Sequence, residues 1–272
     1  MLNGQLLIDF HVHLPQYAER TNSALEWFRS LCPSPEVYDA VSQTCADPAN
    51  FTAMLERKGV DYAVLLAEMT PSVSGVVSNE TIAAFCAQSG RLIPFCTFDP
   101  HRGGDLAAEL HRLAGMGFRG VKLYPTYNYF YPNDAALYPL YGAAQELGMP
   151  VMYHTGLSVF QNSRIKYGNP IFLDDVAVDF PDLTLVMSHG GRGPWYDEAM
   201  TMLRIHKNAY IDITGLPPKK LLQYFPDLPR FADKDWPSVD MRRNAEAVAA
   251  LPLPPEAIRG ILGETAKKLL HL

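Results

Sequence analysis

The sequence lacks the features that mark several large classes of proteins. It has no basic excess, because 23 Lys and Arg stand against 29 Asp and Glu and the net charge at pH 7 is −6. Binding to a nucleic-acid backbone requires clustered positive charge, so we expect no nucleic-acid partner. No apolar run reaches the roughly 18 residues of a membrane helix. We therefore expect no membrane partner and a cytoplasmic protein.

Two further absences concern redox chemistry and nucleotides. The 4 cysteines form no CxxC pair, which favours buried reduced thiols over disulfides or a zinc knuckle. The motifs GxGxxG and GxxxxGK[ST] are also missing. Nothing in the sequence therefore favours an open nucleotide-binding sheet.

What the chain does contain is a regular alternation of short apolar runs and longer amphipathic segments, typical of βα units around a parallel sheet. No Gly/Ser-rich linker divides it, so we expect a single domain over residues 1–272. The expected strands are residues 6–10, 62–67, 92–98, 120–124, 150–153, 183–187 and 209–213. The expected helices are residues 81–88, 105–116, 135–147, 174–180, 196–206, 217–224, 239–250 and 255–270. The prediction is an α/β fold, a (β/α)8 TIM barrel with one strand unaccounted for.

The first strand ends in a pair of histidines, His11 and His13, separated by one residue. Side chains alternate across a strand, so the two imidazoles point the same way with their Cα atoms about 7 Å apart. Zinc and similar metals favour nitrogen ligands of this kind. Taken alone, the pattern fits either a metal site or polar residues at the entry to a loop.

Two more histidines, His154 and His189, end later apolar runs in the same way. In a parallel barrel the carboxyl ends of all strands meet at one mouth, where active sites lie. The sequence therefore predicts that four histidines converge there. The alternative is that each is a half-buried polar residue satisfied by its own surroundings.

Several motifs, taken in their order along the chain, resemble those of the amidohydrolase superfamily. The likeness is closer to its amidohydrolase-related branch, which includes the relatives of aminocarboxymuconate-semialdehyde decarboxylase. The likeness covers nearly the whole chain. The residues that carry it are His11-Val-His13, Gly120-Val-Lys-Leu-Tyr-Pro125, His154, Ser188-His189-Gly-Gly191, Asp235-Trp-Pro237 and Ile261-Leu-Gly263.

The resemblance implies one divalent metal ion, with zinc as the leading candidate, bound by His11, His13, His154 and Asp235. His189 and Asp235 are the implied catalytic residues, acting on the substrate or on a water molecule activated by the ion. The implied partner is a small-molecule substrate, and barrels of this kind often form homodimers.

Lys122 on the fourth strand has two interpretations. In binuclear members of the superfamily a carboxylated lysine bridges two metals, whereas here Lys122 can instead form a buried ion pair beneath the site. Arg192 can bind a substrate carboxylate in a bidentate manner or remain an ordinary solvated arginine. The candidate substrate-binding residues are Tyr124, Tyr127, Arg192 and Trp195.

The sequence departs from the family pattern before Asp235. The family's aspartate ends an apolar strand, but here Asp235 directly follows Phe231-Ala-Asp-Lys234. The expected eighth strand is thus incomplete. Either the protein has lost the residues of this strand, or the residues are missing from the sequence and the numbering continues without them.

Three functions remain open from the sequence. The leading hypothesis is a metal-dependent hydrolase that cleaves an amide, ester or lactone bond of a small polar or carboxylated substrate. The second is a metal-dependent, non-oxidative decarboxylase of an aromatic or unsaturated acid. The third is a metal-free relative that serves as a binding protein.

Overall fold

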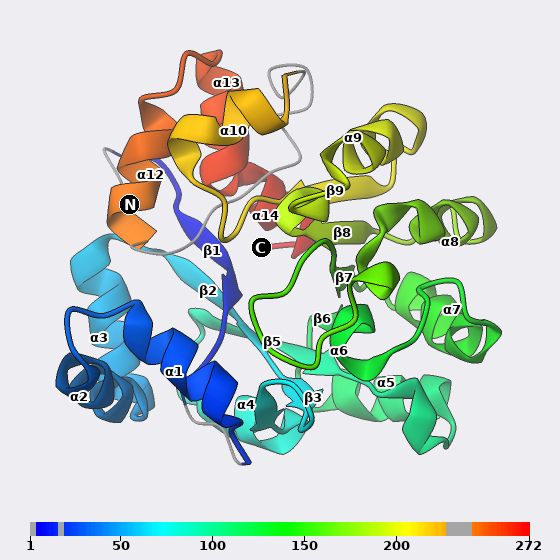
Figure 1. Cartoon of the computed structure of the whole chain (residues 1–272), viewed down its shortest axis with the longest axis horizontal. Helices are drawn as coiled ribbons and strands as arrows, with labels where there is room; N and C mark the ends of the chain where they lie inside the picture. The colour runs from blue at the N-terminus through cyan, green and yellow to red at the C-terminus, as the bar shows by residue number, and fades with distance from the viewer. Residues whose placement is uncertain (1–3, 16–18, 227–240) are drawn as a thin grey trace.

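The computed structural model describes residues 4–15, 19–226 and 241–272. Its main sheet has 7 strands in the order β1-β2-β5-β6-β7-β8-β9, and each neighbouring pair is parallel. In Figure 1 these strands form an inner curved sheet with the helices outside it, and β1 and β9 are the two edges of that sheet. The strands are β1 (Ile8–Val12), β2 (Tyr62–Leu66), β5 (Leu92–Thr97), β6 (Gly120–Leu123), β7 (Val151–His154), β8 (Leu185–Ser188) and β9 (Ala209–Asp212).

The fold is an α/β TIM-barrel-like fold, which confirms the predicted class. Each of the seven predicted strands overlaps an observed one. The strands β5 to β8 are buried along their whole length, because helices cover the sheet from outside and side chains fill it from inside. Because of this burial, these strands appear in the sequence as nearly continuous apolar runs. The expected eighth strand and Asp235 lie outside the described residues.

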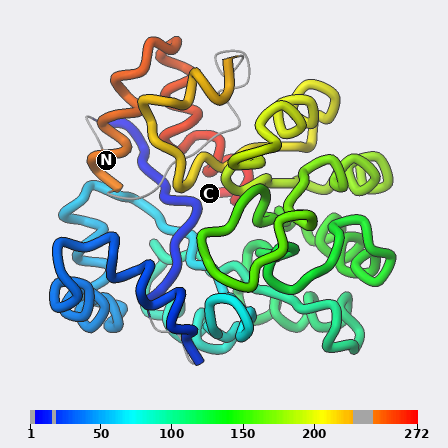
Figure 2. Tube along the Cα trace, in the orientation of Figure 1, coloured from blue at the N-terminus to red at the C-terminus, as the bar shows by residue number. Residues whose placement is uncertain are grey.

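The chain winds once around the barrel axis, from the blue first strand through green to the red C-terminal helices (Figure 2). Helices α1 to α3 precede β2, and their N-terminal caps are Thr21, Ser34 and Asp47. No pattern in the sequence had predicted these three. The helices are α1 (Asn22–Ser30), α2 (Pro35–Cys45), α3 (Pro48–Lys58), α4 (Asn79–Cys86), α5 (Leu106–Gly115), α6 (Pro125–Asn128), α7 (Tyr138–Glu146), α8 (Leu173–Asp179), α9 (Tyr196–Ile205), α10 (Leu221–Tyr224), α12 (Met241–Ala249), α13 (Pro255–Arg259) and α14 (Thr265–Leu269).

The C-terminal helix that was expected over residues 255–270 is divided into three pieces. A π-helical turn, Gly260–Glu264, separates α13 from α14 and packs against β1. A side chain at Gly263 would place its Cβ only 2.9 Å from the Leu6 carbonyl oxygen, so only glycine permits this close approach. The end of the chain thereby covers the first strand.

A short hairpin, β3 (Glu68–Thr70) and β4 (Gly75–Val77), follows β2 and was not predicted from the sequence. Its strands are 3 residues each, shorter than the runs that reveal a strand by alternation. Its position immediately after β2 places it at the mouth of the barrel, where the parallel strands end.

The cysteines are free thiols, and the expectation of burial holds for Cys45, Cys86 and Cys96 but not for Cys32, which is half-buried. Burial raises the pKa of the Cys86 thiol to about 12, so it remains protonated at neutral pH. None of the described helices is both long enough and apolar enough to cross a membrane.

Candidate active site

The first-strand histidines, His11 and His13, turn toward each other at the mouth of the barrel. Their Nε2 atoms are 3.2 Å apart and their ring centroids 5.2 Å apart. The pairing of β1 with β2 shifts register between Asp9 and Val12, and the His11 N–H donates a 3.1 Å hydrogen bond to Asp9 Oδ1. Irregularities of this kind redirect side chains. This one lies where the two imidazoles leave the strand.

Each of these two imidazoles has a buried carboxylate behind it. His11 Nδ1 lies 2.5 Å from Asp212 Oδ2, and His13 Nδ1 lies 3.1 Å from Glu68 Oε2. When both Nδ1–H groups donate to these carboxylates, both Nε2 atoms carry lone pairs that face each other. The two lone pairs repel each other, and a cation bound between the two atoms would remove that repulsion.

The spacing of the two Nε2 atoms is compatible with a bound metal ion. Burial, together with the positive charge of Lys122, lowers the pKa of His11 well below its ordinary value, so His11 is neutral near pH 7. Zinc binds imidazole nitrogens at about 2.0–2.1 Å, which places two ligands of a tetrahedral ion about 3.4 Å apart. The observed 3.2 Å between the Nε2 atoms of His11 and His13 is close to that spacing.

The two carboxylates, Glu68 and Asp212, were not singled out by the sequence patterns. Glu68 directly follows the apolar run 62–67, and Asp212 lies within the run 209–213. The signal that pointed to the histidines, a polar residue at the end of an apolar run, would have found Glu68, whereas Asp212 is the last residue only of the observed β9.

The other two predicted histidines lie beside the first pair. The His154 ring, at the end of β7, is 4.7 Å from the His189 ring, which in turn is 5.2 Å from the His11 ring. His154 Nε2 is buried and has no hydrogen-bond partner among the described residues. Buried polar atoms are nearly always satisfied, so this nitrogen is available to a ligand.

His189 is held in an unusual backbone conformation. Its φ is +64°, a left-handed value that costs a non-glycine residue free energy, and Gly190 follows at +52°. His189 Nδ1 lies 2.6 Å from the Thr214 carbonyl oxygen. Because the carbonyl can only accept, Nδ1 carries the proton and Nε2 is left as an acceptor.

Burial also determines the charges around the histidines. It lowers the pKa of His154 and His189 well below the ordinary range, and the positive charge of Arg192 adds to the effect at both. Asp212 is affected in the opposite direction, because burial raises the pKa of its carboxyl group. The site thus combines neutral imidazoles with the positive charge of Arg192 and a buried carboxyl group.

Lys122 is completely buried on β6, beneath the histidines. Its Nζ donates a 2.7 Å hydrogen bond to Ser188 Oγ. Burial lowers its pKa, while the carboxylates of Asp212 and Glu68 oppose that shift. The expected ion pair is therefore replaced by a hydrogen bond to a hydroxyl group, with the two carboxylates acting over a longer distance.

Aromatic rings form one wall of the site. Tyr124 and Tyr127 are buried and stacked with ring centroids 5.7 Å apart, and the Tyr127 ring lies 4.7 Å from the His154 ring. Tyr124 donates its hydroxyl hydrogen to the Ala67 carbonyl oxygen, and Tyr127 accepts one from Ser158. The Tyr124 hydroxyl hydrogen is therefore engaged, whereas Tyr127 uses its hydroxyl oxygen as an acceptor and keeps its own hydroxyl hydrogen.

The remaining candidates, Arg192 and Trp195, follow β8. Arg192 is half-buried and donates from Nη2 to the Leu157 carbonyl oxygen at 2.7 Å. Its charge reaches His154 and His189. Trp195 is half-buried where α9 begins, with its backbone N–H donating to Gly191. A role in substrate binding stays a prediction for both.

The residues present fit a metal ion only in part. Within residues 4–15, 19–226 and 241–272, no three His, Cys, Asp or Glu side chains form a ready-made metal site. The paired Nε2 atoms of His11 and His13 and the unsatisfied Nε2 of His154 nevertheless supply donors of the right chemistry. The predicted fourth ligand, Asp235, is outside the described residues.

Together the fold and the mouth residues define a class of protein, a parallel barrel that gathers imidazoles, carboxylates and buried cations where its strands end. Within that class, the chain belongs to the amidohydrolase family, whose model matches residues 8–272. The resemblance carried by the sequence motifs is thereby confirmed.

Several solved structures share this fold over nearly their whole length. An uncharacterised TIM-barrel protein from Bordetella bronchiseptica is 24% identical with a TM-score of 0.78, covering 97% of this chain and 98% of its own. A manganese-bound 5-carboxyvanillate decarboxylase from Novosphingobium aromaticivorans is 15% identical with a TM-score of 0.70, covering 99% and 97%. A probable 2-pyrone-4,6-dicarboxylic acid hydrolase from Acinetobacter baumannii, with citric acid bound, is 16% identical with a TM-score of 0.70, covering 98% and 99%. At these identities the likeness shows the fold alone.

Proposed function

We propose that this protein is a metal-dependent enzyme that hydrolyses an ester, lactone or amide bond in a small carboxylated substrate. The observation that carries the proposal is the pair of imidazole Nε2 atoms of His11 and His13, 3.2 Å apart, each ring backed by a buried carboxylate. Metal-binding histidines characteristically donate their other ring N–H to such a partner. The proposed ligands are His11, His13 and His154, with Asp235 as the fourth.

A bound divalent ion, zinc in the first instance, would lower the pKa of water toward roughly 7 and polarise a carbonyl oxygen. The protein's own residues supply the rest. The free Nε2 of His189 can accept a proton or a hydrogen bond next to the ligand set, because Thr214 holds the proton on Nδ1. Asp235 is the second proposed proton acceptor.

The substrate is recognised by charge and by aromatic surface. The positive charge of Arg192 favours a carboxylate, which its guanidinium can bind through two parallel hydrogen bonds. The stacked rings of Tyr124 and Tyr127 favour a planar, unsaturated body. These two features define the proposed substrate class.

Hydrolysis requires water at the site, and His13 supports it as the leading reaction. Its side chain is 26% exposed, whereas the side chains of His11 and Asp212 behind it are almost completely buried. Solvent therefore reaches the imidazole pair from the side of His13. The second candidate, decarboxylation of an aromatic acid, is favoured by the stacked tyrosines and by the decarboxylase named among the similar structures.

Metal analysis combined with a product assay tests the proposal. Purified protein loaded with zinc or manganese should retain about one ion per chain after desalting, and His13→Ala should lose both the ion and the activity. The assay should use 2-pyrone-4,6-dicarboxylate and 5-carboxyvanillate, the compounds named for the similar structures. Ring opening without carbon dioxide indicates hydrolysis, whereas carbon dioxide release indicates the second candidate.

The result that would contradict the proposal is equally definite. If the loaded protein holds no ion and His13→Ala behaves as the unmodified protein does, the metal-free binding role becomes the better explanation. Two ions per chain would instead support the interpretation of Lys122 as a carboxylated lysine that bridges two metals.

A further inference from the structure

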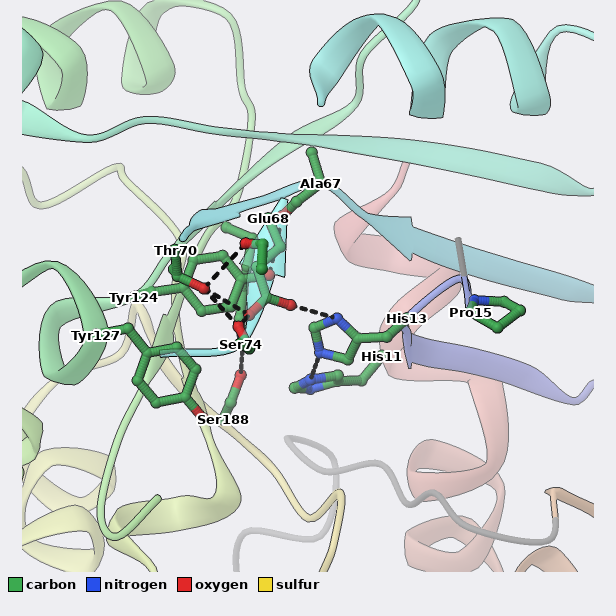
Figure 3. A network of polar contacts seen from close by, with 12 residues as sticks. His11, His13, Pro15, Ala67, Glu68, Thr70, Ser74, Tyr124, Tyr127 and Ser188 are labelled. Atoms are coloured by element: carbon green, nitrogen blue, oxygen red, sulfur yellow. Dashed lines mark hydrogen bonds and ion pairs between the residues drawn. The ribbon is translucent and has the colours of Figure 1, made fainter. Parts of the chain in front are cut away.

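Glu68 is a buried acid at the mouth of the barrel whose position the metal ligands alone do not explain. It is the first residue of β3, directly after β2, and is 1% exposed. Its Oε2 lies 3.1 Å from His13 Nδ1. Figure 3 shows the carboxylate turned toward the His13 ring, on the side opposite the His11 contact.

The second oxygen of Glu68 is held by two hydroxyl groups. Thr70 Oγ1 donates to Glu68 Oε1 at 3.0 Å, and Ser74 Oγ donates to the same oxygen. Thr70 and Ser74 are both buried, and their hydroxyl oxygens are 2.5 Å apart. With both oxygens engaged, the carboxylate cannot rotate without breaking buried hydrogen bonds, each of which is costly to lose.

The hairpin that carries these hydroxyl groups is itself fixed. Thr21 caps α1, and its N–H donates to the Ser74 carbonyl oxygen at 3.1 Å. The Thr21 hydroxyl group donates to the Val73 carbonyl oxygen at 2.7 Å. The β3–β4 turn is thus attached to α1 as well as to its own strands, so Glu68 has a rigid base.

The orientation of Glu68 has a chemical consequence for His13. A carboxylate that accepts from Nδ1–H keeps the imidazole in one tautomer and one ring orientation, with the lone pair on Nε2. In that tautomer Nε2 can bind a cation, and it is this atom that faces His11. Without an acceptor at Nδ1, the proton can occupy Nε2 instead and block the lone pair.

We infer that Glu68 is a positioning residue, which holds His13 as the Nδ1–H tautomer with Nε2 directed at the position of the metal. The inference rests on the proposed metal-dependent function and assigns the β3–β4 hairpin a role in it. Asp212 does the same for His11 from β9, so two carboxylates from opposite sides orient the first-strand pair.

Metal affinity is the first test. Zinc and manganese binding should be measured by competition with a chelating dye on the full chain. Glu68→Ala should bind about 10- to 100-fold more weakly, the range found when partners of metal ligands are removed. Glu68→Gln keeps an acceptor for Nδ1–H and should recover most of the loss. If circular dichroism shows that Glu68→Ala does not fold, Glu68→Leu takes its place in the test. Leucine fills the space of the glutamate side chain but offers no acceptor to Nδ1–H.

The chain offers a matched control in a second His–carboxylate pair, His206 and Asp174. His206 directly follows α9 and Asp174 lies on α8, with His206 Nε2 2.6 Å from Asp174 Oδ1, and neither residue belongs to the hairpin or to a strand end. Asp174→Ala should leave metal affinity unchanged. This control distinguishes the effect of removing a carboxylate beside any histidine from the effect of removing Glu68, the carboxylate beside His13.

The tautomer itself is the second test and does not require the metal. Long-range ¹H–¹⁵N correlation spectra of the metal-free protein should show His13 as the Nδ1–H form, with loss of that form in Glu68→Ala and its retention in Glu68→Gln. An unchanged His13 tautomer in folded Glu68→Ala would overturn the inference, and so would unchanged metal affinity. Failure of the unmodified protein to bind metal would instead overturn the proposed function, which is a distinguishable result.

Discussion

His11 and Asp212 connect the first and the last described strands of the barrel, with His11 Nδ1 2.5 Å from Asp212 Oδ2. They are 201 residues apart in the chain, and both are almost completely buried. Among the described residues, no backbone pairing joins β9 to β1, so this side-chain contact spans the open edge of the sheet. A contact that orients a proposed metal ligand therefore also links the two ends of the sheet.

Replacing Asp212 should weaken both metal binding and the fold. Asp212→Ala removes the acceptor behind His11, and we expect metal affinity to fall by about 10- to 100-fold. The substitution also leaves Lys122 buried without one of the two carboxylates that stabilise its charge, so we expect a loss of about 3–5 kcal/mol in the free energy of unfolding. Calorimetric titration with zinc measures the first effect and urea unfolding the second. Full metal affinity in the folded variant would contradict the expectation.

Lys122 should be essential for stability. Lys122→Met keeps the length of the side chain but leaves the carboxylates of Asp212 and Glu68 buried without the cation that stabilises them. Removing one member of a buried charged group costs about 3–5 kcal/mol, and we expect a loss of that size in the free energy of unfolding. Lys207→Met, at an exposed lysine, is the control. Equal stability of the two variants would show that Lys122 contributes nothing.

Gly190 should not tolerate even a methyl group. Its φ is +52°, and an added Cβ would lie 2.6 Å from Phe225 Cζ. The backbone strain of about 1–2 kcal/mol and the overpacking of about 1–3 kcal/mol predict that Gly190→Ala loses roughly 2–5 kcal/mol. Gly90→Ala is the control, since nothing lies within 4 Å of its Cβ position. Thermal unfolding of both variants measures the difference.

The stability of the metal-free protein should fall as the pH is lowered below about 6.5. The pKa of His11, His154 and His189 is lowered by burial, so in this range the unfolded chain binds protons that the folded protein does not. The free energy of unfolding then rises with pH, by up to about 1.4 kcal/mol per pH unit for each histidine.

The variant His154→Gln isolates one of these contributions. Its unfolding free energy, measured by urea titration in the presence of a chelator at pH 5.5 and 6.5, should depend less steeply on pH than that of the unmodified protein, by about 1.4 kcal/mol per pH unit at most. Parallel curves would mean that His154 binds its proton equally in the folded and unfolded chain.

Arg192 should determine affinity for the carboxylate of the substrate. A hydrogen bond to a charged group contributes about 1.5–3 kcal/mol, so Arg192→Met should raise KM by roughly 10- to 150-fold. The same variant should bind an uncharged methyl ester of the substrate nearly as well as the unmodified protein does. Arg57→Met, at an exposed arginine on α3, controls for net charge. An equal loss with acid and ester would argue against charge recognition.

Local sequence patterns predicted much of the fold because they depend on neighbouring residues. A strand buried on both faces must be apolar along its length, and this condition is visible in runs such as residues 92–98 and 120–124. The same patterns did not reveal the β3–β4 hairpin, whose strands are too short, or helices α1 to α3. The count of one domain and the homodimer stay predictions.

The histidines that end the strands were likewise determined by the sequence, because parallel strands bring their carboxyl ends to one mouth. Which partner stands behind each imidazole was decided only by the tertiary structure. The Asp212 contact depends on where β9 lies relative to β1, and the Glu68 contact on a hairpin fixed by Ser74 and Thr21. Such pairings join residues far apart in the chain, so their distances follow from the curvature and register of the whole sheet and not from any local pattern.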